Sequence, residues 1–186
     1  MPLATGDGWI SAEVSTLKHC KRLANYPIHI TQNSLPEIDT VSYVTDTLHV
    51  NTTMLLGGTL SVDSNKTMLV SGTLHCAPSS RIIVRPGGKL VVDGGTLTSA
   101  CAGEMWQGVY VEGHRDQPQT AANQGTVQLI NGAVVENAFR GIRTSAPGSG
   151  WNTTGGIITA DSATFRNCAK AVEYLSYAGT NYAGQV

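Results

Sequence analysis

The chain has 186 residues, which suits a single domain with a continuous core. Only 13% of its residues are charged, against about 25% in average soluble domains, and its formal net charge is -1. With no run of basic residues, this composition argues against a nucleic-acid partner. No apolar stretch approaches the ~18 residues of a membrane-spanning helix, so no membrane span is expected.

Residues 1–45 are predicted to be an N-terminal lead-in that contains one helix, Ser11–Tyr26. Apolar residues recur at helical spacing along this segment, and they include Val14, Leu17, Cys20 and Leu23. Ser11 is a suitable N-cap, and Pro27 ends the run. Because the first coil of a stacked-strand fold exposes strand edges and core, we expect this helix to cap that end. A helix lying on a membrane surface through its basic face is the alternative.

Residues 46–186 carry the signature of a parallel β-helix. Short runs of β-branched and aliphatic residues alternate with turns rich in Gly, Asn, Asp and Ser, such as Pro86-Gly87-Gly88. The segment also repeats itself, because residues 125–144 align with residues 155–174 at an offset of 30 without a gap. A fixed period of this size in strand-forming sequence predicts a solenoid in which each coil packs on its neighbours.

The 30-residue offset makes the coil prediction specific. We expect about four coils within residues 54–175. Pairs on neighbouring strands are expected to be Val127 with Ile157, Ile142 with Val172, Glu136 with Arg166, Arg143 with Glu173, and Asn137 with Asn167. The same offset places Asp63 over Asp93, although both precede turn residues and are expected to be turn formers.

Two polar loops interrupt the later coils, at residues 112–125 and 146–154. Both leave the coil between strands, so we expect them to project on the same side. After Tyr174 no capping segment is recognisable. The final coil is therefore expected to be open, and either a continuation of the chain or end-to-end self-association would cover its edges.

Four cysteines are present, at positions 20, 76, 101 and 168, and their spacing fits no metal-binding pattern. We therefore expect no metal and no cofactor. Cys76 and Cys101 are 25 residues apart, close to one coil, which makes them candidates for a disulfide between neighbouring turns. Two free thiols are the alternative. Cys168 replaces Ala138 in the repeat and is expected to be a small buried residue.

Three motifs in the coils form a recognisable set: the run Arg81–Cys101 with Pro-Gly-Gly-Lys-Leu, the run Met105–Gly113 beginning Met-Trp-Gln-Gly, and the unit Glu136-Asn-Ala…Gly-Ile. Together they resemble the β-helix region of large secreted bacterial surface proteins, many exported by the type IX system with a C-terminal sorting domain. The resemblance covers about Thr47 to Gly184. It implies an all-β, right-handed parallel β-helix of the pectin-lyase-like kind, outside the cell or on its surface. Two departures from the family pattern are that these residues show no signal-peptide pattern and no sorting-domain pattern. The resemblance carries over no catalytic residues.

The candidate binding residues are aromatic and polar side chains around the two loops, namely Trp106, Tyr110, Glu112, His114 and Trp151. Aromatic faces offer a large amphipathic contact area for a sugar ring. The alternative for Trp106 is a core position, since it follows Met105 in a strand-like run.

These observations favour a non-catalytic segment of a secreted or cell-surface protein that acts as a stalk or as a carbohydrate-binding, adhesive scaffold. The partner would be a polysaccharide or a cell-surface glycan. The alternative is part of a polysaccharide lyase or glycoside hydrolase, which would need two carboxylates clustered on one outward strand face.

Overall fold

The computed structural model describes residues 12–15, 21–24, 36–38, 42–43, 46–149 and 151–177. Within these residues the protein is all-β, and most strands form three parallel sheets. Sheet 1 contains β4 (Ser42–Tyr43), β7 (Thr59–Val62), β10 (Arg81–Val84), β13 (Trp106–Val111), β16 (Ala138–Arg143) and β19 (Lys170–Glu173). Sheet 2 contains β5 (Thr47–Val50), β8 (Thr67–Val70), β11 (Lys89–Asp93), β14 (Thr126–Ile130) and β17 (Ile157–Ala160). Sheet 3 contains β3 (Glu37–Ile38), β6 (Met54–Leu56), β9 (Thr73–Cys76), β12 (Thr96–Ser99), β15 (Val134–Glu136) and β18 (Thr164–Arg166).

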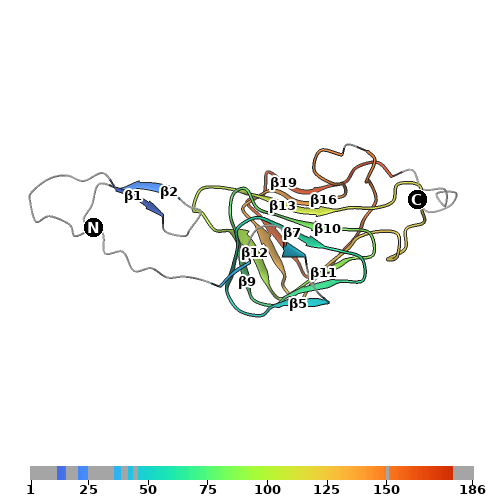
Figure 1. The fold of residues 1–186 in the computed structure, drawn as a ribbon, viewed down its shortest axis with the longest axis horizontal. Helices are drawn as coiled ribbons and strands as arrows, with labels where there is room; N and C mark the ends of the chain where they lie inside the picture. The colour runs from blue at the N-terminus through green and yellow to red at the C-terminus, as the bar shows by residue number, and fades with distance from the viewer. Residues whose placement is uncertain are drawn as a thin grey trace, which may run out of the picture.

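Each coil contributes one strand to each sheet, so the architecture is a three-sided parallel β-solenoid (Figure 1). From β6 to β17 the described chain makes four complete coils, and β18 and β19 belong to the next. The prediction of about four coils is confirmed. Parallel pairing begins earlier than residue 46, because β3 pairs with β6 and β4 with β7. No helix among the described residues is long and apolar enough to cross a membrane.

The core includes a column of stacked apolar side chains behind each of the three sheets. The register places every member of a column on the equivalent strand of the next coil. The sheet 1 column is Leu60, Ile82, Val109, Ile142 and Val172. The sheet 2 column is Leu48, Met68, Leu90, Val127 and Ile158. The sheet 3 column is Met54, Leu74, Leu97, Val135 and Phe165.

The predicted register is correct in the last coils at two of the three sheets. Ile142 pairs with Val172, and Arg143 pairs with Glu173. Glu136 pairs with Arg166, and its carboxylate accepts a hydrogen bond of 2.7 Å from the Arg166 Nε.

The predicted pairing of Val127 with Ile157 is wrong by one residue, since Val127 pairs with Ile158 and Thr126 with Ile157. A shift of one residue exchanges the two faces of a strand, but Ile157 and Ile158 are both apolar. The sequence alignment therefore could not distinguish the two registers.

The 30-residue offset does not hold in the earlier coils. Arg81 pairs with Thr59 and Lys89 with Thr67, which is an offset of 22 in both sheets. The expected stacking of Asp63 on Asp93 is therefore wrong. These coils are shorter because their corners are tight turns, and the Gly-Gly matches that produced the alignment come from different corners.

An asparagine ladder joins three coils on one edge of sheet 3. The Asn167 Nδ2 donates to the Asn137 Oδ1 at 2.6 Å, and the Asn137 Nδ2 donates to the Thr98 Oγ1 at 3.0 Å. The backbone φ is positive at both residues, 54° at Asn137 and 49° at Asn167. Asn tolerates positive φ better than most residues with a Cβ. The prediction that Asn137 and Asn167 stack is confirmed.

The helix predicted at Ser11–Tyr26 is wrong for the part of it that the structure describes. β1 (Ala12–Ser15) and β2 (Lys21–Ala24) are antiparallel strands that pair with each other. Helical spacing of apolar residues over so short a segment is a weak signal, and β-branched Val14 suits a strand. The remainder of Ser11–Tyr26 lies outside the described residues, so the capping role stays a prediction.

The disulfide proposed between Cys76 and Cys101 is also wrong. Cys76 is a free, fully buried thiol, whereas Cys101 is disulfide-bonded, so the two are not joined to each other. The register explains the error, because Cys76 pairs with Ser99 and its side chain belongs to the core cluster. Cys168 is a free thiol that is partly buried against the core.

Gly108 should be the least replaceable glycine of the coils. It lies at the register shift of sheet 1 with φ of 104°, and a Cβ there would lie 1.5 Å from the Arg140 backbone oxygen. Gly108→Ala should cost more than about 4 kcal/mol of unfolding free energy. Gly132→Ala is the matched control, because its φ is 81° but no atom lies within 4 Å of the added Cβ. The control should cost about 1–2 kcal/mol. Equal losses of stability in urea titrations of the two variants would contradict the register shift.

Alkylation should distinguish the environments of Cys76, Cys101 and Cys168. Burial raises the pKa of both the Cys76 and Cys168 thiols, and only Cys168 is partly exposed. Since the thiolate is the reactive form, iodoacetamide should label Cys168 slowly in the native protein and Cys76 only after unfolding. Cys101, which is disulfide-bonded, should be labelled only after reduction. Peptide mass spectrometry measures all three, and rapid native labelling of Cys76 would place it outside the core.

Candidate functional site

The candidate site lies at the corner where sheet 1 passes into sheet 2. In the first coils this corner is a tight turn, at residues 63–66 and 85–88. In the next two coils the same corner carries the long loops at residues 112–125 and 144–156, and the segment 174–177 follows β19 at the equivalent place. The loops therefore project on the same side, as predicted. The Gly113 N–H donates to the Thr153 oxygen at 3.0 Å, which joins the first two.

Gln124 holds the two long loops together. Its side chain is fully buried, and its Nε2 donates to the His114 oxygen at 3.1 Å, with the Pro118 and Gln117 oxygens at 3.3 and 3.4 Å. Its Oε1 accepts a hydrogen bond of 3.0 Å from the Gly156 N–H. One amide thus forms hydrogen bonds with backbone groups of both loops. These bonds also satisfy the amide itself, which would otherwise carry the free-energy cost of an unpaired buried polar group.

Glycine is required around this amide. A Cβ at Gly113 would lie 1.9 Å from the Gln124 Oε1, and one at Gly155 would lie 2.1 Å from it. Gly155 and Gly156 also have positive φ, 144° and 77°. The loops therefore approach each other closely because both present bare backbone to Gln124.

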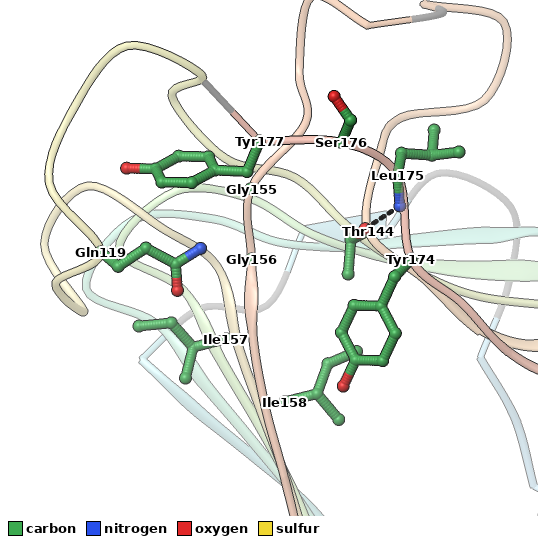
Figure 2. Close-up of a pocket in the computed structure, with 10 residues that line it drawn as sticks. All are labelled: Gln119, Thr144, Gly155, Gly156, Ile157, Ile158, Tyr174, Leu175, Ser176 and Tyr177. Carbon is green, nitrogen blue, oxygen red and sulfur yellow. Dashed lines mark hydrogen bonds between the residues drawn. The ribbon is translucent and has the colours of Figure 1, made fainter. Parts of the chain in front are cut away.

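A groove of about 420 Å³ opens between the loops. Its lining is Gln119, Thr144, Gly155, Gly156, Ile157, Ile158, Tyr174, Leu175, Ser176 and Tyr177, none of them charged. Figure 2 shows the rings of Tyr174 and Tyr177 in different parts of the groove, with Tyr177 drawn toward Gln119 and Tyr174 toward Ile158. Thr144 accepts a hydrogen bond of 2.9 Å from the Leu175 N–H, which fixes the segment carrying both tyrosines.

A smaller hollow of about 280 Å³ lies beside the same loop and is lined by His114, Arg115, Asp116, Gln117 and Asn152. Its lining is entirely polar. The Tyr177 hydroxyl donates to the Gln117 oxygen, so a groove residue contacts a hollow residue directly.

A ladder of alternating charge lies at the base of the corner. Asp63, Arg85 and Glu112 follow residues that pair with one another on β7, β10 and β13. The Arg85 Nε lies 3.0 Å from an Asp63 oxygen, and its Nη1 lies 3.6 Å from a Glu112 oxygen. Burial raises the pKa of Glu112 above its ordinary value, Arg85 opposes the rise and Asp63 adds to it.

Glu173 has the opposite environment on the outer face of sheet 1. Lys170 and Arg140 both donate to its carboxylate, and an Arg143 Nη1 lies 3.3 Å from it. The hydrogen bond from Lys170 is the largest influence, and with the two arginines it holds the pKa of Glu173 below its ordinary value although burial opposes this.

The structure separates the predicted binding residues. Trp106 is fully buried, and its Nε1 donates to the Glu136 oxygen at 3.0 Å, so its ring lies in the core and is not available to a ligand. Tyr110 and Glu112 are 3% and 8% exposed, which leaves little surface for a contact. His114 lines the hollow, and Trp151, 55% exposed, precedes Asn152 of the same hollow.

The sequence pattern does not point to the groove residues. Tyr174 and Tyr177 follow the last recognisable strand, and Gln124 is one of several polar residues in its loop. The signal that the sequence offers for Gln124 is its position two residues before β14, separated from the strand only by Gly125.

No group of three or more potential metal ligands of the His, Cys, Asp and Glu types occurs among the described residues. No known protein family, no curated protein and no solved structure shows significant similarity to the chain. The chemistry of the corner is therefore the basis for assigning a function.

The two carboxylates should have opposite effects on stability as pH changes. Glu173, with its lowered pKa, stabilises the fold above about pH 4.3, and the effect is lost as pH falls through the lowered value. Glu173→Gln should therefore be destabilising at pH 7, and this effect should shrink as the pH falls through the lowered pKa of Glu173. Because the pKa of Glu112 is raised in the folded state, the folded protein favours the protonated carboxyl group. Ionisation of Glu112 at higher pH therefore lowers the free energy of unfolding.

Glu112→Gln should accordingly raise the free energy of unfolding at pH 7 and have little effect at pH 3. Urea titrations of both variants from pH 3 to pH 8 measure these differences, and each variant serves as the control for the other. Effects of the same sign at pH 7 would show that the two environments are not as described.

Proposed function

We propose that this chain is a non-catalytic carbohydrate-binding scaffold, a right-handed parallel β-helix segment of the pectin-lyase-like kind within a secreted or cell-surface protein. The groove at the loop corner carries the proposal. It combines two tyrosines with amide, hydroxyl and backbone groups and has no charged residue among its lining. Its volume of about 420 Å³ is within the usual ~300–1,000 Å³ of small-molecule sites.

A neutral saccharide matches this lining. Tyr174 is 67% exposed, and its ring can stack against the apolar face of a sugar ring. Gln119 and Ser176 line the same groove and can donate to and accept from hydroxyl groups. A site with no charge of its own does not favour an ionic ligand, and it leaves hydrogen bonding and stacking as the means of recognition.

The enzyme alternative has one feature in its favour, the carboxylates of Asp63 and Glu112, which follow β7 and β13 on either side of β10. Both carboxylates are ion-paired with Arg85, and neither lines the groove or the hollow. Their contacts are those of a structural charge ladder. This supports a scaffold, because a general acid or base must reach the proton it transfers.

A glycan array followed by calorimetric titration of the bound glycan tests the proposal. Tyr174→Ala should weaken binding about tenfold, because it removes a stacking contact. Phe139→Ala is the matched control, since Phe139 is 47% exposed and does not line the groove. It should leave the affinity unchanged. The absence of any bound glycan, or an equal loss in both variants, would contradict the proposal.

Incubation with the bound glycan tests the enzyme alternative. The scaffold should release no new reducing or unsaturated ends over hours. Release that disappears in Glu112→Gln would establish the enzyme alternative instead.

A further inference from the structure

We infer that the groove and the hollow are two subsites of one site, which takes a linear oligosaccharide rather than a single sugar. This inference rests on the proposed function. It adds the length of the ligand and the residues that contact its second sugar unit.

The same two loops supply residues to both cavities. The loop of residues 112–125 supplies Gln119 to the groove and Gln117 to the hollow. The loop of residues 144–156 supplies Gly155 to the groove and Asn152 to the hollow. The hydrogen bond from the Tyr177 hydroxyl to the Gln117 oxygen lies where these two linings meet.

The sizes of the cavities favour one ligand over two. The groove, at about 420 Å³, is large enough to be a site by itself. The hollow, at about 280 Å³, is below the usual range for an independent small-molecule site. It suits one further unit of a ligand that is already held in the groove.

The chemistry of the hollow fits another polyhydroxylated unit. Arg115 supplies only donors and Asp116 only acceptors, and the amide of Asn152 supplies both. The opposite charges of Arg115 and Asp116 leave no net attraction for an anionic substituent. Both types of hydrogen-bonding partner are therefore available to the hydroxyl groups of a neutral sugar.

Gln124 fixes the position of the hollow relative to the groove. Its hydrogen bonds reach His114 and Gln117 of the hollow and Gly156 of the groove from one buried side chain. A ligand spanning both subsites then meets loops that are already ordered, which lowers the entropic cost of binding. Gln124 is a positioning residue, since it is fully buried and lines neither cavity.

Calorimetry with glucose, mannose and N-acetylglucosamine, each compared with the linear tetrasaccharide of the same sugar, tests this inference. For the recognised sugar, this tetrasaccharide (the tetramer) should bind about tenfold more tightly than the monosaccharide (the monomer), because it gains hydrogen bonds in the hollow. Asp116→Asn and Asn152→Ala should reduce tetramer affinity toward the monomer value and leave monomer affinity unchanged. Tyr174→Ala should weaken both ligands, and Asp161→Asn, outside both cavities, should weaken neither.

Equal affinity for monomer and tetramer, with no effect of Asp116→Asn, would overturn the inference and leave the proposed function intact. Failure of all six saccharides to bind would overturn both.

Gln124→Met provides an independent measurement. It should weaken monomer and tetramer alike and speed hydrogen exchange at the Gly156 amide, while the amides of β11 and β14 remain protected. Unchanged exchange at Gly156 together with unchanged affinities would show that Gln124 does not position the site.

Discussion

The structure depends on the stacking of apolar side chains in columns behind each of the three sheets. Members of a column lie on adjacent strands, about 4.8 Å apart, and each covers the next. A single coil could not bury its own apolar face, so each coil is stable only on a neighbour. At the last described coil this cover is reduced, and Ile158 and Phe165 are only partly buried.

Because the columns fix the strands, the corners can vary in length. The corner between sheets 1 and 2 has four residues in two coils and carries long loops in the next two, yet β14 and β17 return to the same sheet. Loop closure becomes only slowly more costly with length, so such insertions are tolerated. The groove is a consequence of this tolerance, since it is built almost entirely from corner segments held over rigid strands.

Charged side chains lie at the base of this corner and are absent from the groove lining. The ladder of Asp63, Arg85 and Glu112 lies at the base of the turns, and Glu173 gathers Lys170 and two arginines on the outer face of sheet 1. Neither cluster contributes a side chain to the groove lining. The fold therefore presents a neutral, aromatic surface on a scaffold whose ion pairs are already satisfied within the protein.

The sequence by itself determined the strand-based solenoid, the four coils from β6 to β17, the side on which the loops project and the pairs Ile142–Val172, Glu136–Arg166 and Asn137–Asn167. These features depend on local patterning and on a repeat, both of which are visible in one dimension. The register of Val127 was decided only by the tertiary structure, because two adjacent isoleucines satisfy the apolar pattern equally. The environment of Cys76 likewise depends on coil length, which turn geometry sets. The site was decided last of all, because Gln119, Gly155 and Tyr177 come from three coils and meet only when the columns bring their corners together.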